Sequence, residues 1–451
     1  MGRVSLYYFV VLLTFLYITY KNRESSLKVF IILCFYSGLA SFYGKAIENP
    51  YKIIVVILSI YFLLKRNSLS GLTRRERLFF LTFILFSISF LYSAIINGDY
   101  FNLVFSQYGK YVTPVCLFFV FNRVLLKNPG TFINLKDLFF SLLTIQILLS
   151  VVKIPTIGLQ ETIVGSIAYL GGGQATMVPV LGFILVWLHK QGNINRKDWI
   201  YIALLLFIGF ASLKRAIWFI MPFIIFLFLY YVPKKLKVSH LIYFLPLIPL
   251  VFYAGVRLSP TLNKEGKLWG TYDLQYALDY VQKYTFGKTS KISDIQLGTG
   301  RGGATFLLWK KLFNSEPFSS NDYWGTGLRE VYTTDYDQFN DDKYGVNSKG
   351  SVTGVFQSYI SSGYVGVIVT ILLIISVLGL IKEPRIRITL ALLVFWDYLF
   401  YSGLILRSQV LFILLFYIII YSNLQFDQNL YRKYLIRKPD DKNRNLQPLP
   451  A

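Results

Sequence analysis

The chain has 451 residues, of which 55% are hydrophobic, 18% aromatic and only 15% charged, and its formal net charge is +23 at pH 7. A soluble protein of this length could not cover so much apolar surface with so few polar residues, so a soluble globular fold is excluded. The basic residues concentrate in short loops between apolar blocks, a pattern that membrane topology explains without nucleic-acid binding.

The apolar blocks are about 15 to 20 residues long, the length of a helix that crosses a bilayer. We therefore expect an all-α polytopic membrane protein with about 12–14 transmembrane helices and one large external loop that contains amphipathic helices. The first block, Leu6 to Tyr20, lacks a small-residue cleavage site and is expected to be a span, not a signal peptide. The predicted spans are 5–20, 29–43, 53–64, 78–96, 108–126, 138–152, 175–189, 199–213, 216–232, 241–256, 353–381, 388–405 and 408–423.

Charge alternates between successive loops. One set of short loops, together with the tail after Asn423, holds about 26 Lys and Arg, whereas the other set holds only about eight. The positive-inside rule therefore places the first set and the C-terminus in the cytoplasm. The expected organisation is a membrane bundle over 1–256, a periplasmic loop over 257–352, the rest of the bundle over 353–423 and a cytoplasmic tail over 424–451.

The long loop contains two predicted amphipathic helices, at about 272–286 and 304–314, which would lie on the membrane surface or cap the bundle. It is also rich in aromatic residues. Sugar rings stack on aromatic side chains, but an interfacial aromatic belt is an equally good interpretation, and both stay open. These aromatic residues are Trp269, Tyr272, Trp309, Tyr323, Trp324, Tyr332, Tyr336 and Tyr344.

Cysteine and histidine are scarce. Cys34 and Cys116 lie inside apolar blocks and are expected to be packing or lipid-facing residues, not a disulfide. His189 and His240 each lie at the end of a span, so a His/Cys metal centre is not expected, and no cofactor is predicted.

A glycine-rich turn, Gly298-Thr299-Gly300-Arg301-Gly302-Gly303, stands just before the second predicted loop helix. Glycines such as Gly300 and Gly302 let the backbone approach an anion, the first N–H groups of a helix point at it, and the Arg301 guanidinium can fork onto its oxygens. This pattern favours a phosphate site. The alternative is an ordinary turn with a solvated arginine.

Basic residues also occupy two tight external turns, at Lys214-Arg215 and at Arg407. They are either side chains that snorkel to the interface or cations that meet an anionic lipid head group. With Arg301 they would offer a diphosphate several contacts and stabilise the negative charge that develops as it leaves, without a metal ion.

Asp397 lies within a predicted span, where a carboxylate is costly. A catalytic role and pairing with a partner such as Arg407 are both open. Ten residues correspond to about 15 Å along a helix, so direct pairing requires a break at Ser402-Gly403.

The chain resembles the O-antigen ligase and polymerase superfamily in four features taken together: Gly298 to Arg301, Trp309, Gly325-Thr326-Gly327 and the stretch Gln357 to Gly366. The Lys214-Arg215 turn is also similar to that family's outer-face arginine. The resemblance covers about residues 165 to 370. It implies transfer of a glycan from undecaprenyl diphosphate at the external face of the bacterial inner membrane. The resemblance implies that Arg215 and Arg301 bind the diphosphate and that Trp309 packs the loop. We expect the substrate-binding residues to be Lys214, Arg407, Gly300, Gly302, Trp309 and Trp324.

The ligase branch of that family carries a His-Asn pair after the loop, whereas this chain reads Ser348 to Thr353 there, without histidine. The difference favours a polymerase of lipid-linked repeat units. A general base must accept the acceptor proton. Glu161, Asp322 and Asp335 are candidates, and Glu161 ranks first because its loop is shorter.

Three alternatives stay open: a ligase that moves finished glycan to lipid A core or protein, a lipid-linked glycan flippase, and a non-catalytic scaffold. Transporters commonly carry internal repeats and broken helices, whereas the polar residues here concentrate in one loop. The expected partners are undecaprenyl-diphosphate-linked oligosaccharide and membrane lipid. A chain-length regulator protein remains a further possibility.

Overall fold

The computed structural model describes residues 23–38, 45–65, 71–159, 163–167, 173–190, 193–213, 217, 220, 223–228, 247–286, 320–332 and 353–427. These residues form helices and their connections, and no strand occurs among them. Five of the described helices are long and apolar enough to cross a membrane, so the chain has the character of an all-α polytopic membrane protein. The five are α5 (Arg74–Ile96), α6 (Phe101–Lys127), α7 (Pro129–Ile157), α19 (Gly354–Gly379) and α22 (Gln409–Phe426).

The other described helices complete the bundle and part of the long loop. They are α2 (Arg23–Phe35), α4 (Lys45–Lys65), α8 (Gly173–Lys190), α9 (Arg196–Ala211), α12 (Leu247–Leu258), η2 (Pro260–Leu262), α13 (Leu274–Phe286), α16 (Ser320–Trp324), α17 (Leu328–Tyr332), α20 (Pro384–Phe400) and α21 (Leu404–Arg407).

The five long helices cover predicted spans, but α5, α6 and α7 begin several residues earlier than hydropathy predicts. Polar residues and proline start these helices outside the apolar blocks. Thr73 and Glu76 form a reciprocal capping box at the start of α5, and Pro129 occupies the first turn of α7, where its missing N–H costs nothing.

Three predicted spans differ from the structure: 29–43, within which α2 ends at Phe35, 353–381, which is interrupted at Gly363, and 388–405. The apolar run 388–405 does not form one helix, because α20 ends at Phe400 and Gly403 adopts a left-handed backbone with φ of 61°. The short helix α21 follows before α22 begins. Hydropathy does not register this interruption, because the residues on both sides of it are apolar.

The predicted span 241–256 is described only from residue 247, as α12, which continues to Leu258, is not among the five long apolar helices and packs with η2 and α13 of the loop. The α13 helix covers the first amphipathic helix predicted in the loop. The predicted span 5–20, the second loop helix at 304–314 and the polar tail 438–451 lie outside the described residues.

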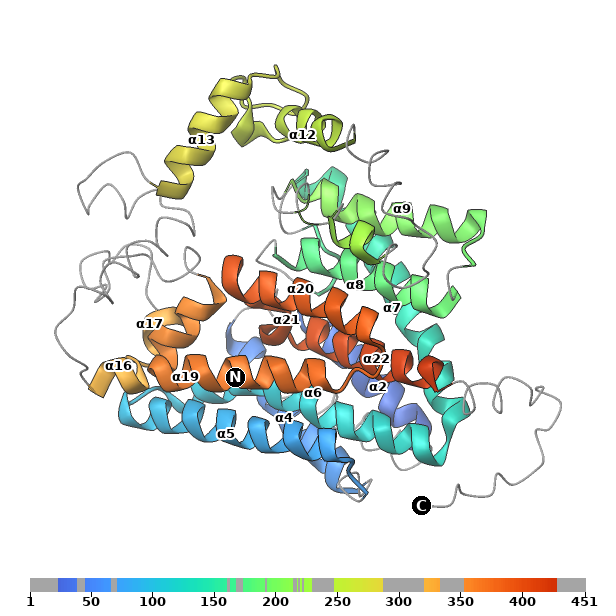
Figure 1. Ribbon diagram of the computed structural model, residues 1–451, viewed down its shortest axis with the longest axis vertical. Coiled ribbons are helices and arrows are strands. Elements are labelled where there is room, and N and C mark those ends of the chain that lie inside the picture. Colours follow the sequence, from blue (N-terminus) through green and yellow to red (C-terminus); the bar gives the residue numbers. More distant parts are fainter. Residues whose placement is uncertain are drawn as a thin grey trace.

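The α22 helix forms the centre of the bundle. Its residues from Val410 to Ser422 are all buried, and it packs against α6 and α8. The α5 helix packs against α19, and α4 packs against α6, so helices from both halves of the chain lie side by side (Figure 1). Buried hydroxyls add contacts between the helices: the Oγ1 of Thr82 in α5 lies 2.7 Å from the Oγ of Ser376 in α19.

The two ends of this bundle differ in charge. At one end α5 begins and α6, α19 and α22 end, around a cleft that includes Arg75 and Lys382. At the other end α5 passes into α6, and α19 and α22 begin. Figure 1 shows α16 and α17 beside this second end. The basic side chains of the first end are Arg74, Arg75, Arg77, Arg123, Lys127, Lys382, Arg385 and Arg387.

The α19 helix is interrupted at Gly363, whose φ of 65° and ψ of −162° are not helical. The loop segment before α17 fills the break. The backbone N–H of Thr326 donates to the carbonyl of Ile360 at 2.7 Å. A side chain at Gly363 would collide with the carbonyl of Tyr323, so loop and helix approach each other more closely than any residue but glycine permits.

We expect Gly363→Ala to destabilise the protein by about 1–3 kcal/mol, because alanine is strained at this φ and its methyl group meets the Tyr323 backbone. Thermal unfolding of the detergent-solubilised protein measures this. Gly379→Ala, in the same helix but with open space around it, is the control and should unfold like the wild type. Equal unfolding of both variants would show that the interruption is not required.

Candidate functional site

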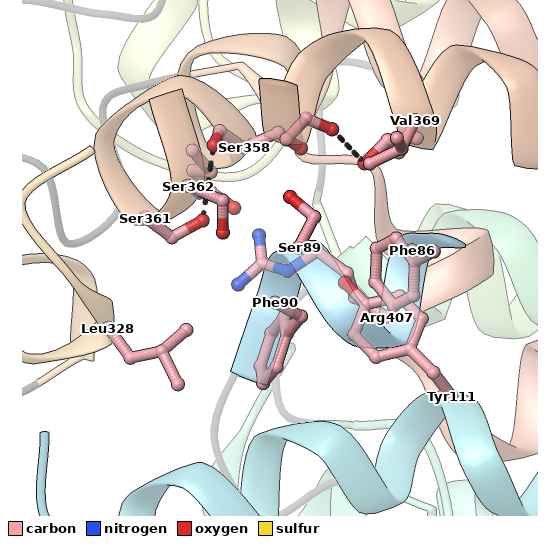
Figure 2. Close-up of a pocket in the computed structure, with 13 residues that line it drawn as sticks. Phe86, Ser89, Phe90, Tyr111, Leu328, Ser358, Ser361, Ser362, Val369 and Arg407 are labelled. Atoms are coloured by element: carbon pink, nitrogen blue, oxygen red, sulfur yellow. Dashed lines mark hydrogen bonds between the residues drawn. The ribbon is translucent and has the colours of Figure 1, made fainter. Parts of the chain in front are cut away.

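A small cavity of about 20 Å³ lies between α5, α6, α19, α17 and Arg407, at the end of the bundle away from the basic cleft. Figure 2 shows the Arg407 guanidinium inside it, with Ser361 and Ser362 of α19 on one side and Phe90 of α5 on the other. A cavity of this size has room for about one water molecule, so a larger ligand such as a phosphate requires the surrounding side chains to move apart. The lining residues are Phe86, Ser89, Phe90, Tyr111, Leu328, Gln357, Ser358, Ser361, Ser362, Gly366, Val369, Thr370 and Arg407.

The break between α20 and α22 positions Arg407. The carboxylate of Asp397, which is 1% exposed, accepts the N–H of Ile405 at 2.7 Å and so caps α21. The Arg407 guanidinium donates to the carbonyl of Ser402 at 3.0 Å. Gly354 at the start of α19 donates its N–H to the carbonyl of Tyr401, which ties this turn to α19. The break at Ser402-Gly403 that pairing would require is therefore present, and the Asp397 carboxylate supports the turn that carries Arg407.

Ser89 presents a hydroxyl without a matched partner. The residue is 3% exposed, and among the described residues its Oγ has no hydrogen-bond partner. Ser93, one turn further along α5, differs: its Oγ lies 2.6 Å from the carbonyls of both Trp324 and Ser361. A buried hydroxyl is costly unless something hydrogen-bonds to it. Ser89 is thus available to a ligand, whereas Ser93 is structural.

The second half of α19 begins at Tyr364, directly after the interruption, and its first turn includes the pocket residue Gly366. The start of a helix carries partial positive charge. With the guanidinium of Arg407 and the hydroxyl of Ser89, the pocket combines groups that bind an oxyanion such as phosphate.

Leu328 closes one side of the pocket, and Asp99 holds it there. The two carboxylate oxygens of Asp99 accept the N–H groups of Leu328 at 2.7 Å and Arg329 at 2.9 Å. Burial raises the pKa of Asp99, while these two hydrogen bonds and the charge of Arg329 act in the opposite direction. The turn between α5 and α6 therefore fixes the start of α17.

Two further contacts hold the preceding helix, α16. The Tyr359 hydroxyl donates to Asp322 at 2.7 Å, and the rings of Tyr92 and Trp324 meet edge to face with centroids 4.5 Å apart. Asp322, a candidate general base, thus lies beside α19 and bonds to Tyr359. Trp324 packs against α5 next to the pocket and is not among its lining residues.

Sequence reasoning proposed nine site residues, of which the described residues include Arg407 and Trp324. The structure brings Arg407 together with the Gln357 to Gly366 stretch in one pocket, and Gly325 and Gly327 hold the loop segment beside it. The predicted residues outside the described part are Glu161, Lys214, Arg215, Gly300, Arg301, Gly302 and Trp309.

Sequence reasoning missed Ser89 and Asp99. Serines recur along α5 at Ser87, Ser89 and Ser93, and polar residues in an otherwise apolar span are an available signal. Asp99 had no comparable signal, because its partners are backbone N–H groups more than 200 residues away.

No family model, curated protein or solved structure matches the chain.

We expect Ser89→Ala to leave the unfolding temperature unchanged or slightly raised, because no hydrogen bond is lost. Ser93→Ala should destabilise the protein by about 0.5–1.5 kcal/mol, because it removes the hydroxyl between α19 and the loop. Thermal unfolding of the two variants provides the comparison. An equal loss in both would mean that the Ser89 hydroxyl has a structural partner.

Asp99→Ala should loosen the segment that closes the pocket, because two backbone N–H groups lose their acceptor at a cost of about 1–3 kcal/mol. Hydrogen exchange of peptides covering residues 325–332 should become faster. Asp137→Ala, which removes an exposed carboxylate beside Lys136, is the control and should leave this exchange unchanged. Unaltered exchange in Asp99→Ala would contradict the assigned role.

Proposed function

We propose that the chain is a membrane glycosyltransferase that polymerises undecaprenyl-diphosphate-linked oligosaccharide repeat units at the external face of the bacterial inner membrane. The observation that carries this proposal is the pocket around Arg407, which offers cationic and hydroxyl groups to an oxyanion. The resemblance of its α19 stretch and of Gly325-Thr326-Gly327 to the O-antigen ligase and polymerase superfamily supports the same conclusion.

The charge difference between the two bundle ends supports the orientation. The end with Arg74, Arg75 and Arg77 belongs in the cytoplasm by the positive-inside rule, and α22 ends there, which directs the C-terminal tail inward. The pocket then opens toward the external leaflet, where the diphosphate of a lipid-linked glycan lies after translocation.

The proposed chemistry uses arginine as the source of positive charge. An acceptor hydroxyl attacks the anomeric carbon of the donor glycan, the bond from that carbon to the phosphate oxygen breaks, and undecaprenyl diphosphate leaves. Arg407, joined by Arg215 and Arg301 from the predicted external turns, stabilises the charge on the leaving diphosphate. The acceptor proton passes to a carboxylate, for which Glu161 remains the first candidate.

A flippase for the same lipid is the second candidate, and the interruption of α19 favours it. Discontinuous helices with polar residues near mid-membrane are common in transporters. In this chain the loop backbone fills the interruption, which favours a fixed site over a moving gate.

We expect Arg407→Ala to shorten or abolish the ladder of polysaccharide chain lengths in a complemented deletion strain, because the diphosphate loses a charged contact. Arg407→Lys should recover part of the ladder, since lysine keeps the charge without the planar fork. Arg77→Ala, an exposed arginine at the basic end, is the control and should give wild-type ladders. A full ladder from Arg407→Ala would remove this pocket from the proposal.

Arg215→Ala and Arg301→Ala should each abolish chain extension while the protein remains in the membrane, as a gel ladder and a membrane immunoblot would show. Free polymer that is no longer attached to lipid A core would identify a ligase instead. Repeat units trapped on the cytoplasmic face would identify a flippase. Full-length ladders from both variants would refute the diphosphate-binding role.

A further inference from the structure

We propose that the segment 247–286 is an interfacial anchor that inserts Trp269 and the leucines around it into the surface of the lipid bilayer. This inference concerns a surface apart from the Arg407 pocket and does not depend on the proposed function. Figure 1 shows α12 and α13 set apart from the bundle.

The segment has a small core of its own. Val256 of α12, Leu262 of η2 and Ala277 of α13 are buried together, with Phe252 and Tyr280 packed against them. The side-chain amide of Asn263 donates to the carbonyls of Arg257, Ser259 and Lys267, which closes the connection between the helices. The segment therefore presents a defined surface.

Trp269 is held outward in a strained conformation. Its φ of 58° lies in the left-handed region, which is unfavourable for a bulky residue, and its side chain is 54% exposed. Arg257 stabilises this arrangement: its guanidinium lies 4.5 Å from the Trp269 ring centroid, and its Nε donates to the carbonyl of Gly270. A strained backbone persists only where neighbouring contacts hold it, and here the contacts of Arg257 hold the Trp269 side chain at the surface.

Apolar side chains extend this surface over both helices. The ring of Tyr253 lies 4.9 Å from the ring of Tyr272, which joins α12 to the connection. Leu250 lies one turn before Tyr253, and Leu274 and Leu278 lie one turn apart on α13. The large apolar side chains exposed on this segment are Leu250, Tyr253, Leu268, Trp269, Tyr272, Leu274 and Leu278.

This composition favours lipid over glycan as the occupant. Four of the seven side chains are leucines, which offer a sugar no hydrogen bond, whereas tryptophan and tyrosine with leucine are typical of the bilayer interface. Arg257 covers one face of the Trp269 ring and donates within the segment, to Gly270 and to the hydroxyl of Tyr253. Lys264 and Lys267 pair with Asp273 and Glu265, so the surface attracts lipid through its apolar area and not through net charge.

Spin-label accessibility in the full-length protein tests the proposal. The protein is reconstituted into nanodiscs of phosphatidylethanolamine and phosphatidylglycerol, with a label at Trp269→Cys, Leu278→Cys or Lys264→Cys. The wild-type chain, whose Cys34 and Cys116 are buried, controls for background labelling. Leu278→Cys leaves the Arg257 and Trp269 contact intact, so it reports on the segment even if Trp269→Cys disturbs the connection.

Labels at 269 and 278 should collide more with oxygen, which dissolves in lipid, than with a water-soluble nickel chelate, whereas the label at 264 should show the reverse order. Greater access of nickel at 269 and 278 would overturn the proposal. So would immobilisation of these labels only on addition of glycan, or dipolar broadening from a second copy of the chain, because each identifies another occupant.

Discussion

A broken helix within a membrane must find partners for the backbone groups that the break releases, and this constraint organises the described part of the molecule. In α19 the carbonyl of Ile360 accepts the N–H of Thr326, and the carbonyl of Ser361 lies within reach of the Ser93 hydroxyl. The loop segment is thus part of the bundle's hydrogen bonding. The backbone around Tyr323 lies so close to Gly363 that no side chain fits between them. This contact fixes the loop segment before α17, and with it Leu328, which closes one side of the pocket.

The second interruption places a cation at the same end of the bundle. In a continuous helix over 388–405 the chain would keep one direction. The turn at Gly403 instead changes its direction, and Arg407 of α21 then lines the pocket. Burial of Asp397 is costly, but its carboxylate satisfies the N–H of Ile405 that the turn exposes. Both breaks therefore use polar groups to shape one site, and an intact pair of helices would not bring those groups together.

Hydropathy predicted the class of fold and the position of each of the five long helices, because the length and apolarity of a span are local properties of the sequence. It did not predict the interruption of α19, because Gly363 lies among residues that are apolar or small. The cationic character of the Arg407 turn was readable from sequence, since a basic residue between two apolar runs stands out. The residues that meet it there, Ser89 and Leu328, depend on contacts between distant segments, which a single sequence does not encode in any local pattern.

In the described part of the chain, the buried and partly buried hydroxyl groups of α5 fall into two kinds: those that hydrogen-bond to a neighbouring segment and one, on Ser89, that does not. Thr82 contacts Ser376 of α19, Ser87 accepts the hydroxyl of Tyr108 in α6, and Ser93 contacts the loop. Each of these bonds joins α5 to a neighbour. Ser89 lies between them and is buried, and among the described residues no group accepts from or donates to its Oγ. Alanine would remove that cost, and a water molecule in the adjacent cavity would offset it by hydrogen bonding to the hydroxyl beside Arg407.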